Sequence, residues 1–239
     1  MENTLTDFYK RATEIELYFD FLSKLSQKDT TLHYKESTKN HSVYINKELL
    51  TILRANCFLL LYNLIESSFK NALWEILGNI QAENLSYDEI SEKIQELWIQ
   101  EQAWIKRDYT SKKFANLIKE ATNVILNGKI KFNQNLIFQQ LSGNVDAKRI
   151  IELSQKYGFE MPQLDGEIAE ILNKIKENRN YLSHGNLTFA DCGKDYSTDE
   201  IVLFKDRVLN YMEKIINNIN FLSSPKIISK VLNKPKNHE

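Results

Sequence analysis

The sequence predicts an all-α fold, a bundle of helices, and two observations support this. Only 7 Gly and 3 Pro occur among its 239 residues, so the two residue types that most often interrupt helices are scarce. Apolar side chains also recur three and four positions apart over most of the chain, which is the periodicity of helices with one buried face. Hydrophobic residues make up 42% of the chain and charged residues 26%, which is typical of a folded protein with a sizeable core.

The first two helices are predicted to be long. Residues 5–26 carry one apolar stripe, and residues 46–81 carry a broad apolar face, for which Gly78 is an alternative end. Between them, residues 28–43 are polar and lack periodicity, so they are predicted to form a loop.

Two shorter helices are predicted to follow. Ser86 and Glu89 fit a capping box that begins a helix running to residue 105, and residues 111–127 form the next helix. At 129–133, Ile and Phe alternate with Lys. This alternation allows one short β segment, with a loop as the alternative.

The last part of the chain is predicted to contain three more helices. The first covers residues 145–157 and starts at Asn144, and the second covers residues 166–184. The third starts at a capping box formed by Ser197 and Glu200 and runs to residue 222. The turn-rich residues 186–197 are predicted to form a loop.

All helices are expected to belong to one domain that covers residues 1–239. Residues 1–45 form its N-terminal helix and loop, and residues 225–239 form a basic C-terminal tail with a short helix at 226–232. No internal repeat divides the chain.

Charge and cysteine content limit the classes of function. A protein that binds nucleic acid by electrostatics alone should be far more basic than this chain, whose formal net charge is −1. Nucleic-acid binding would therefore need a local basic patch, or two such patches paired in an oligomer. Cys57 lies in an apolar run and is predicted to pack in the core, whereas Cys192 lies in the polar loop; neither fits a zinc or disulfide pattern. No signal peptide and no apolar run of roughly 18 residues is visible, so a cytoplasmic protein without a membrane span is expected.

The feature that best indicates chemistry is the stretch from Arg179 to His184, Arg-Asn-Tyr-Leu-Ser-His. Arg179 continues the apolar line of its helix after Ile175, where a core side chain would be expected. An arginine at such a position must be paired or must line a cleft or an interface. Gly185 follows at once and is a natural helix end.

These two residue types can cleave RNA without a metal. A histidine can act as general base or acid for attack of the ribose 2′-hydroxyl on the adjacent phosphate, and an arginine can stabilise the negative charge that develops. Five steps of a regular helix separate the two side chains by about 140° and about 7.5 Å. Because arginine is long and the chain is expected to leave the helix at His184 and Gly185 in a distorted last turn, both side chains could still reach one phosphate. The alternative is a structural arginine in a salt bridge, with a chance match to the motif.

Four segments resemble those of the HEPN superfamily, and most closely those of its MAE-type branch of HEPN-like nucleases. They are residues 60–69, residues 141–148, Arg179 to Gly185, and residues 193–197. The resemblance implies an all-α HEPN bundle with additional helices, and a motif of Arg, a polar residue, three or more further residues and then His. Arg179, Asn180 and His184 occupy these positions.

The resemblance also implies how such a protein acts. Members of this kind usually form homodimers in which both motifs face one cleft, and many are toxins or abortive-infection effectors of prokaryotic conflict systems. Others have lost activity and serve as scaffolds.

Further residues are candidates for supporting roles. Glu66 interrupts the apolar face of the second helix and is predicted to pair with Arg179, with a surface carboxylate as the alternative. Asn180 is predicted to support the motif. Four basic residues are candidates for RNA phosphate contacts, with a solvated charge run as the alternative; they are Lys106, Arg107, Lys112 and Lys113.

The sequence therefore predicts a metal-independent endoribonuclease that has no cofactor and acts on single-stranded RNA, with tRNA loops as one candidate. A homodimer is expected, together with a cognate antitoxin or defence-system protein as a partner. The alternative is an inactive HEPN module that binds a protein or a nucleotide.

Overall fold

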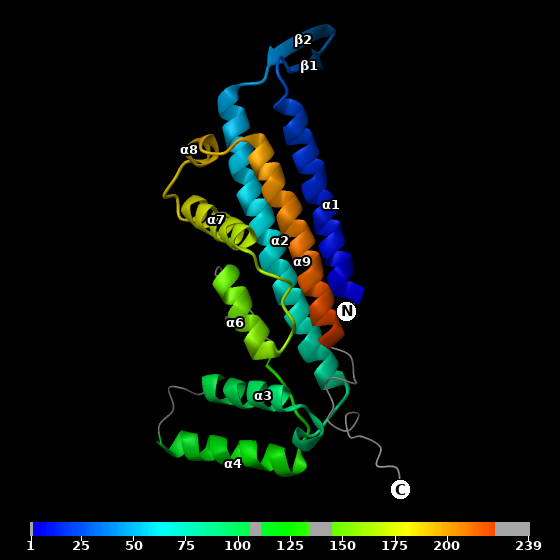
Figure 1. Cartoon of the computed structure of the whole chain (residues 1–239), viewed down its shortest axis with the longest axis vertical. Coiled ribbons are helices and arrows are strands. Elements are labelled where there is room, and N and C mark those ends of the chain that lie inside the picture. The colour runs from blue at the N-terminus through cyan, green and yellow to red at the C-terminus, as the bar shows by residue number, and fades with distance from the viewer. Residues whose placement is uncertain (1, 106–110, 134–144, 223–239) are drawn as a thin grey trace.

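A computed structural model describes residues 2–105, 111–133 and 145–222. Three long helices lie side by side along its long axis (Figure 1); they are α1 (Glu2–Leu25), α2 (Lys47–Ala82) and α9 (Thr198–Leu222). The all-α prediction is confirmed, apart from one short hairpin.

Helix α2 is the central element of the bundle. It contacts α1, α7, α8 and α9, and its apolar side chains, such as Phe58, Leu61 and Phe69, are fully buried. The helix continues through Gly78 to Ala82, so the alternative end at this glycine is wrong. By length and composition α2 could cross a membrane, but its buried face makes it the core helix of the bundle.

The loop predicted at 28–43 is instead an antiparallel hairpin, formed by β1 (Thr31–Glu36) and β2 (Lys39–Tyr44). The ribbon projects beyond the ends of α1 and α2 (Figure 1). Most of its side chains are exposed on both faces, so it lacks the apolar alternation by which a half-buried strand is recognised. Pairs across the strands stabilise it, including the stacked rings of Tyr34 and His41, whose centroids lie 5.1 Å apart.

At the opposite end of α2, the capping box of Ser86 and Glu89 is present, but it caps the short 3₁₀ helix η1 (Tyr87–Glu89). Helix α3 (Glu92–Ile105) begins only after that turn, and α4 (Ser111–Asn127) lies close to its predicted bounds.

The β segment considered at 129–133 is wrong. These residues form no strand, although Ile130 and Phe132 are buried and the backbone N–H of Ile130 donates to Leu85 O at 3.0 Å. The indole N–H of Trp98 donates to Lys131 O at 3.2 Å. The alternation of apolar and basic residues therefore reflects a non-helical segment packed on the core, not a paired strand.

Helices α6 (Ala147–Tyr157) and α7 (Gly166–Ser183) match two of the predicted helices. The cap of α6 is Asp146, whose side chain accepts from Arg149 N, and not the predicted Asn144. The predicted loop at 186–197 contains a short helix, α8 (Phe189–Lys194), which is too short to show a periodic pattern. The predicted helix at 226–232 lies outside the described residues.

Helix α8 packs on α2 through a close backbone approach at Gly193. A Cβ atom at this position would lie 1.8 Å from the carbonyl oxygen of Thr51 and 3.1 Å from Ala55 N. Only a residue without a side chain fits there, so Gly193 determines how the segment after His184 rests on the central helix.

We expect Gly193→Ala to lower the free energy of unfolding by at least about 2 kcal/mol, because the added methyl group meets backbone atoms that cannot move aside cheaply. Urea unfolding monitored by circular dichroism would measure the change. Gly166→Ala is the matched control, since its Cβ would meet nothing within 4 Å and should change stability by about 0.5 kcal/mol or less. Equal effects of the two substitutions would contradict this packing.

Candidate functional site

Arg179 lies near the end of α7, on the same line as the buried residues of that helix. Asp165 caps the start of the helix, and Ile168, Leu172 and Ile175 are buried against the bundle. Arg179 follows them, as the helical phase predicted, and its side chain is 18% exposed. The side chain is therefore largely buried but still partly exposed to solvent.

Three neighbours hold this guanidinium. Its Cζ lies 3.9 Å from the centroid of the Tyr62 ring, its Nη2 donates to Glu66 Oε2 at 3.1 Å, and its Nη1 donates to Asn180 Oδ1 at 2.8 Å. The pairing of Glu66 with Arg179 that the sequence suggested is present. An aromatic face and a carboxylate together offset the cost of burying the charge.

Tyr62 is a part of the site that sequence reasoning missed. Its spacing made it an ordinary core residue, although it lies one helical turn before Glu66 on the same face of α2. The ring is fully buried, its hydroxyl accepts from the backbone N–H of Val145 at 3.1 Å, and burial raises the pKa of Tyr62 to about 12. The ring therefore forms a fixed, neutral platform for the guanidinium.

Further ion pairs join the same elements. Lys70 binds Glu66 on the oxygen that Arg179 leaves free. Lys176 of α7 binds Asp146 at 2.5 Å. Because Asp146 also caps α6, this pair joins the start of α6 to α7, next to the Tyr62–Val145 hydrogen bond.

His184 is the residue that caps the C-terminal end of α7. Gly185 has φ 69° and its N–H donates to Leu182 O at 3.3 Å, while Asn186 N donates to Tyr181 O at 2.8 Å. This is the Schellman pattern, and it confirms Gly185 as the helix end. The side chain of His184 is exposed.

As expected, the chain leaves the helix at His184 and Gly185, but α7 is helical through Ser183 and its last turn is not otherwise distorted. In the part of the chain that the structure describes, no hydrogen bond or ion pair joins Arg179 to His184. Over five residues of a regular helix their side chains diverge by about 140°. Within one copy, the two side chains therefore point in different directions.

A buried polar cluster fixes the segment that follows His184. The side-chain amide of Asn178 donates to the Tyr196 hydroxyl at 2.8 Å, and its oxygen accepts from Cys192 Sγ at 3.2 Å. Arg54 of α2 donates to the backbone carbonyl of Tyr196. Cys192 is thus buried in α8 and not exposed in a polar loop. No sequence signal marked Asn178, because it reads as one more polar residue of an amphipathic helix.

Two of the four basic residues proposed to bind RNA, Lys112 and Lys113, lie away from this site within one copy (Figure 1). Lys112 and Lys113 are exposed on the first turn of α4, and α3 and α6 lie between α4 and α7 (Figure 1). Lys106 and Arg107 lie outside the described residues.

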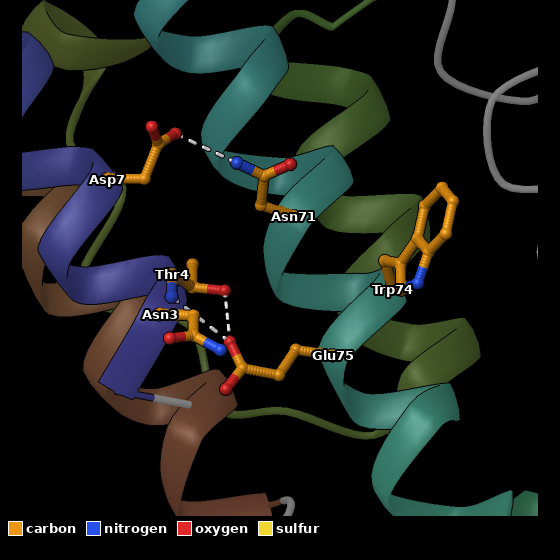
Figure 2. A pocket seen from close by; sticks show the side chains of 6 residues that line it. All are labelled: Asn3, Thr4, Asp7, Asn71, Trp74 and Glu75. Atoms are coloured by element: carbon orange, nitrogen blue, oxygen red, sulfur yellow. Dashed lines mark hydrogen bonds between the residues drawn. The ribbon is translucent and has the colours of Figure 1, made fainter.

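A pocket of about 480 Å³ lies elsewhere, between the start of α1 and the C-terminal half of α2 (Figure 2). Its polar groups bind one another across the gap: Asn71 donates to Asp7 at 2.9 Å, and Thr4 donates to Glu75 through both its hydroxyl and its backbone N–H. The pocket faces α1, whereas Glu66 of the same helix faces α7, so it is separate from the motif.

Comparison with known proteins identifies the family of the chain. Residues 1–226 match the family model described as HEPN_MAE_28990-like HEPN, which covers nearly the whole chain. No curated protein and no solved structure matches the chain. In the fold, the described parts of the four segments that carry the family resemblance all lie around α2 and α7.

We expect Glu66 and Arg179 to be energetically coupled. In a double-mutant cycle with Glu66→Gln and Arg179→Gln, the coupling should be on the order of 1–3 kcal/mol, because both groups are largely shielded from water. Urea unfolding of the four proteins would measure it.

The matched control is the pair of Glu167 and Arg207, which joins α7 to α9 at 2.6 Å but is nearly half exposed on both sides. Its coupling should be about 0.5 kcal/mol or less. A Glu66–Arg179 coupling no larger than that would mean that the pair does not organise the site.

Proposed function

The chain belongs to the HEPN_MAE_28990-like HEPN family, and from this premise we propose that it is a metal-independent endoribonuclease whose catalytic residues are Arg179 and His184. HEPN domains are typically metal-independent ribonucleases. The observation that carries the proposal is the environment of Arg179: its guanidinium is oriented by Tyr62, Glu66 and Asn180, and its side chain is still partly exposed to solvent.

The geometry of Arg179 suits a phosphate ligand. Arginine has five N–H donors, and only those that face Glu66 and Asn180 have partners in the described structure. The remaining donors can bind phosphate oxygens and stabilise the charge that develops during cleavage. Because the guanidinium is already oriented, little reorganisation is needed when RNA binds.

In the proposed reaction, the ribose 2′-oxygen forms a bond to the adjacent phosphorus while the bond from phosphorus to the 5′-oxygen breaks. A base takes the proton of the 2′-hydroxyl, and an acid gives a proton to the leaving 5′-oxygen. The products are a 2′,3′-cyclic phosphate and a 5′-hydroxyl. His184 supplies one of these proton transfers, for which its exposed position on the helix end is suitable.

A homodimer completes this scheme. Arg179 and His184 of one copy diverge, and a single histidine serves only one of the two proton transfers at a time. Two motifs facing one cleft would supply two histidines and two arginines. Pairing two local patches would also explain how a chain of net charge −1 binds RNA.

The biological role that we propose is that of a cytoplasmic toxin or abortive-infection effector, formed by one HEPN domain over residues 1–239. Single-stranded RNA, with tRNA loops as the first candidate, would be its substrate. A cognate antitoxin or defence protein would control it.

An inactive HEPN scaffold is the second candidate. The same contacts of Arg179 favour this candidate. A guanidinium that binds Glu66 and stacks on Tyr62 also stabilises the bundle, whether or not it takes part in a reaction. Growth arrest on expression, relieved by His184→Ala, would exclude a scaffold, since that exposed side chain has no described role in stability.

We expect His184→Ala to lower the rate of RNA cleavage by at least about 100-fold, because it removes a general acid or base. Cleavage of total RNA in EDTA, with analysis of the product ends, would measure this. His41→Ala is the control, since His41 lies on the projecting hairpin and should leave the rate unchanged. Identical RNA profiles for wild type and His184→Ala would overturn the proposal.

A cleft that is formed by the motifs of both copies leads to a separate prediction. Arg179→Ala and His184→Ala should each be inactive alone, but mixed dimers should recover part of the activity, because one copy still supplies the arginine and the other the histidine. Coexpression with two different affinity tags would isolate the mixed dimers. No recovery in dimers of confirmed composition would show that each copy needs its own complete motif.

A further inference from the structure

Tyr181 interrupts the polar line of α7, on the side of the helix that faces solvent. Three charged residues, Glu170, Lys174 and Glu177, precede it on that line at intervals of three and four positions. Tyr181 occupies the next position, and it is 43% exposed. An aromatic ring therefore lies where a charged side chain would be expected, which is the reverse of the situation at Arg179. Because single exposed aromatic residues are common, the surroundings of the ring decide what it can do.

The ring of Tyr181 is not used by the fold. Other exposed tyrosines have partners, since the Tyr9 hydroxyl donates to Glu213 and the Tyr34 ring stacks on His41. Among the residues that the structure describes, neither the ring nor the hydroxyl of Tyr181 makes a ring contact or a hydrogen bond. Its aromatic face is therefore available to a ligand.

This free ring lies beside His184. The backbone N–H of His184 donates to Asn180 O at 3.0 Å, so position 184 still follows the helix. Three helical steps turn the side chains of Tyr181 and His184 only about 60° apart, with a rise of about 4.5 Å, and residues at this spacing are neighbours on a helix surface. Arg179 lies about 200° from Tyr181. The exposed ring and the exposed histidine thus share one side of the helix end.

Leu187 adds a second exposed apolar side chain to this end of α7. The chain turns back after Gly185, and the backbone N–H groups of Asn186 and Leu187 both donate to Tyr181 O, at 2.8 Å and 3.4 Å. Leu187 is 39% exposed, whereas the exposed residues 183–186 and 188 are polar or glycine. Two apolar side chains therefore lie close to His184 on a surface that is otherwise polar.

An unpaired nucleobase is the ligand that fits such a surface. Bases of single-stranded RNA stack on exposed aromatic rings, and every base has a flat face that can do so. Inside a duplex, both faces of a base are already covered by its neighbours. A base stacked on Tyr181 would bring its own ribose and phosphate next to His184, which is where a proton must be transferred.

We propose that Tyr181 stacks on an unpaired base of the RNA and so places the attached ribose and phosphate beside His184. The identity of the ligand rests on the ribonuclease function proposed above. Tyr181 is then a substrate-binding residue that acts by contact, transfers no proton and selects single-stranded over double-stranded RNA.

A 2′-O-methylated single-stranded RNA oligonucleotide is the probe, because it lacks the attacking hydroxyl and its binding can be measured whether or not the protein cleaves RNA. Fluorescence anisotropy over a series of salt concentrations gives the Kd and its salt dependence. Tyr181→Ala should raise the Kd at least about fivefold, the effect of losing one stacked base. The slope of log Kd against log salt should stay the same, because no phosphate contact is lost.

Two further variants at this position separate stacking from other roles of the side chain. Tyr181→Phe should bind as tightly as wild type, since stacking needs the ring and not the hydroxyl. Tyr181→Leu keeps an apolar side chain but has no flat ring, so it should bind nearly as weakly as Tyr181→Ala. The exposed position of Tyr181 means that all three proteins should fold.

The matched control is Tyr44→Ala, which removes a tyrosine that is 74% exposed on the projecting hairpin and should leave the Kd unchanged. A 2′-O-methylated duplex of the same sequence is the control ligand. Wild type and Tyr181→Ala should bind this duplex equally, because its bases offer no free face.

An unchanged Kd in Tyr181→Ala, or wild-type binding by Tyr181→Leu, would overturn the stacking role. Light scattering of the same proteins tests the other use of an exposed ring. A smaller fraction of dimer in Tyr181→Ala than in wild type would assign the ring to a contact between two copies and would also overturn the role.

Failure of this inference can be told apart from failure of the proposed function. If His184→Ala abolishes cleavage but Tyr181→Ala binds like wild type, the ribonuclease stands and the base site fails. If the Tyr181 variants behave as expected but the wild type does not cleave RNA in EDTA, the base site stands and the ribonuclease fails. A wild type that does not bind the oligonucleotide at all would overturn the base site.

Discussion

The guanidinium of Arg179 lies on the apolar line of α7, and the surrounding structure depends on how this charge is accommodated. It stacks on the Tyr62 ring and binds the carboxylate of Glu66, so the central helix α2 supplies both an aromatic face and a counter-charge. Tyr62 in turn binds the backbone just before α6. One buried charge therefore links the three helices, and removal of any one partner would leave the others incompletely satisfied.

The same central helix also determines where the second motif residue lies. The Schellman end of α7 places His184 at the surface, and the chain then returns to α2, where Gly193 allows backbone contact and Asn178 binds Tyr196. Arg179 is thus held from the inside of the bundle, whereas His184 is held by the helix end and the packed segment after it. The two residues are thus positioned in different ways, Arg179 by contacts of its side chain and His184 by the backbone of the helix end.

Most of the helices could be predicted from the sequence, because long amphipathic segments have an unmistakable period and their ends carry caps such as Asp165 and Gly185. The pairing of Arg179 with Glu66 could also be predicted from the sequence, since each residue interrupts an apolar face. The hairpin was missed because neither of its faces is buried, and α8 because it is shorter than two turns. Tyr62 and Asn178 could not be recognised, since their contacts arise only when α7 packs against α2 and against the segment that follows His184.

The projecting hairpin has a practical consequence. Its two-residue turn at Ser37 lies at the tip of a ribbon whose side chains are mostly exposed, far along the molecule from α6 (Figure 1). A surface turn with few packing contacts tolerates inserted sequence better than any helix of the bundle. This turn is therefore a suitable place to attach a fluorophore or an affinity handle, which would allow the protein to be immobilised or followed without altering α2, α7 or the surface that they share.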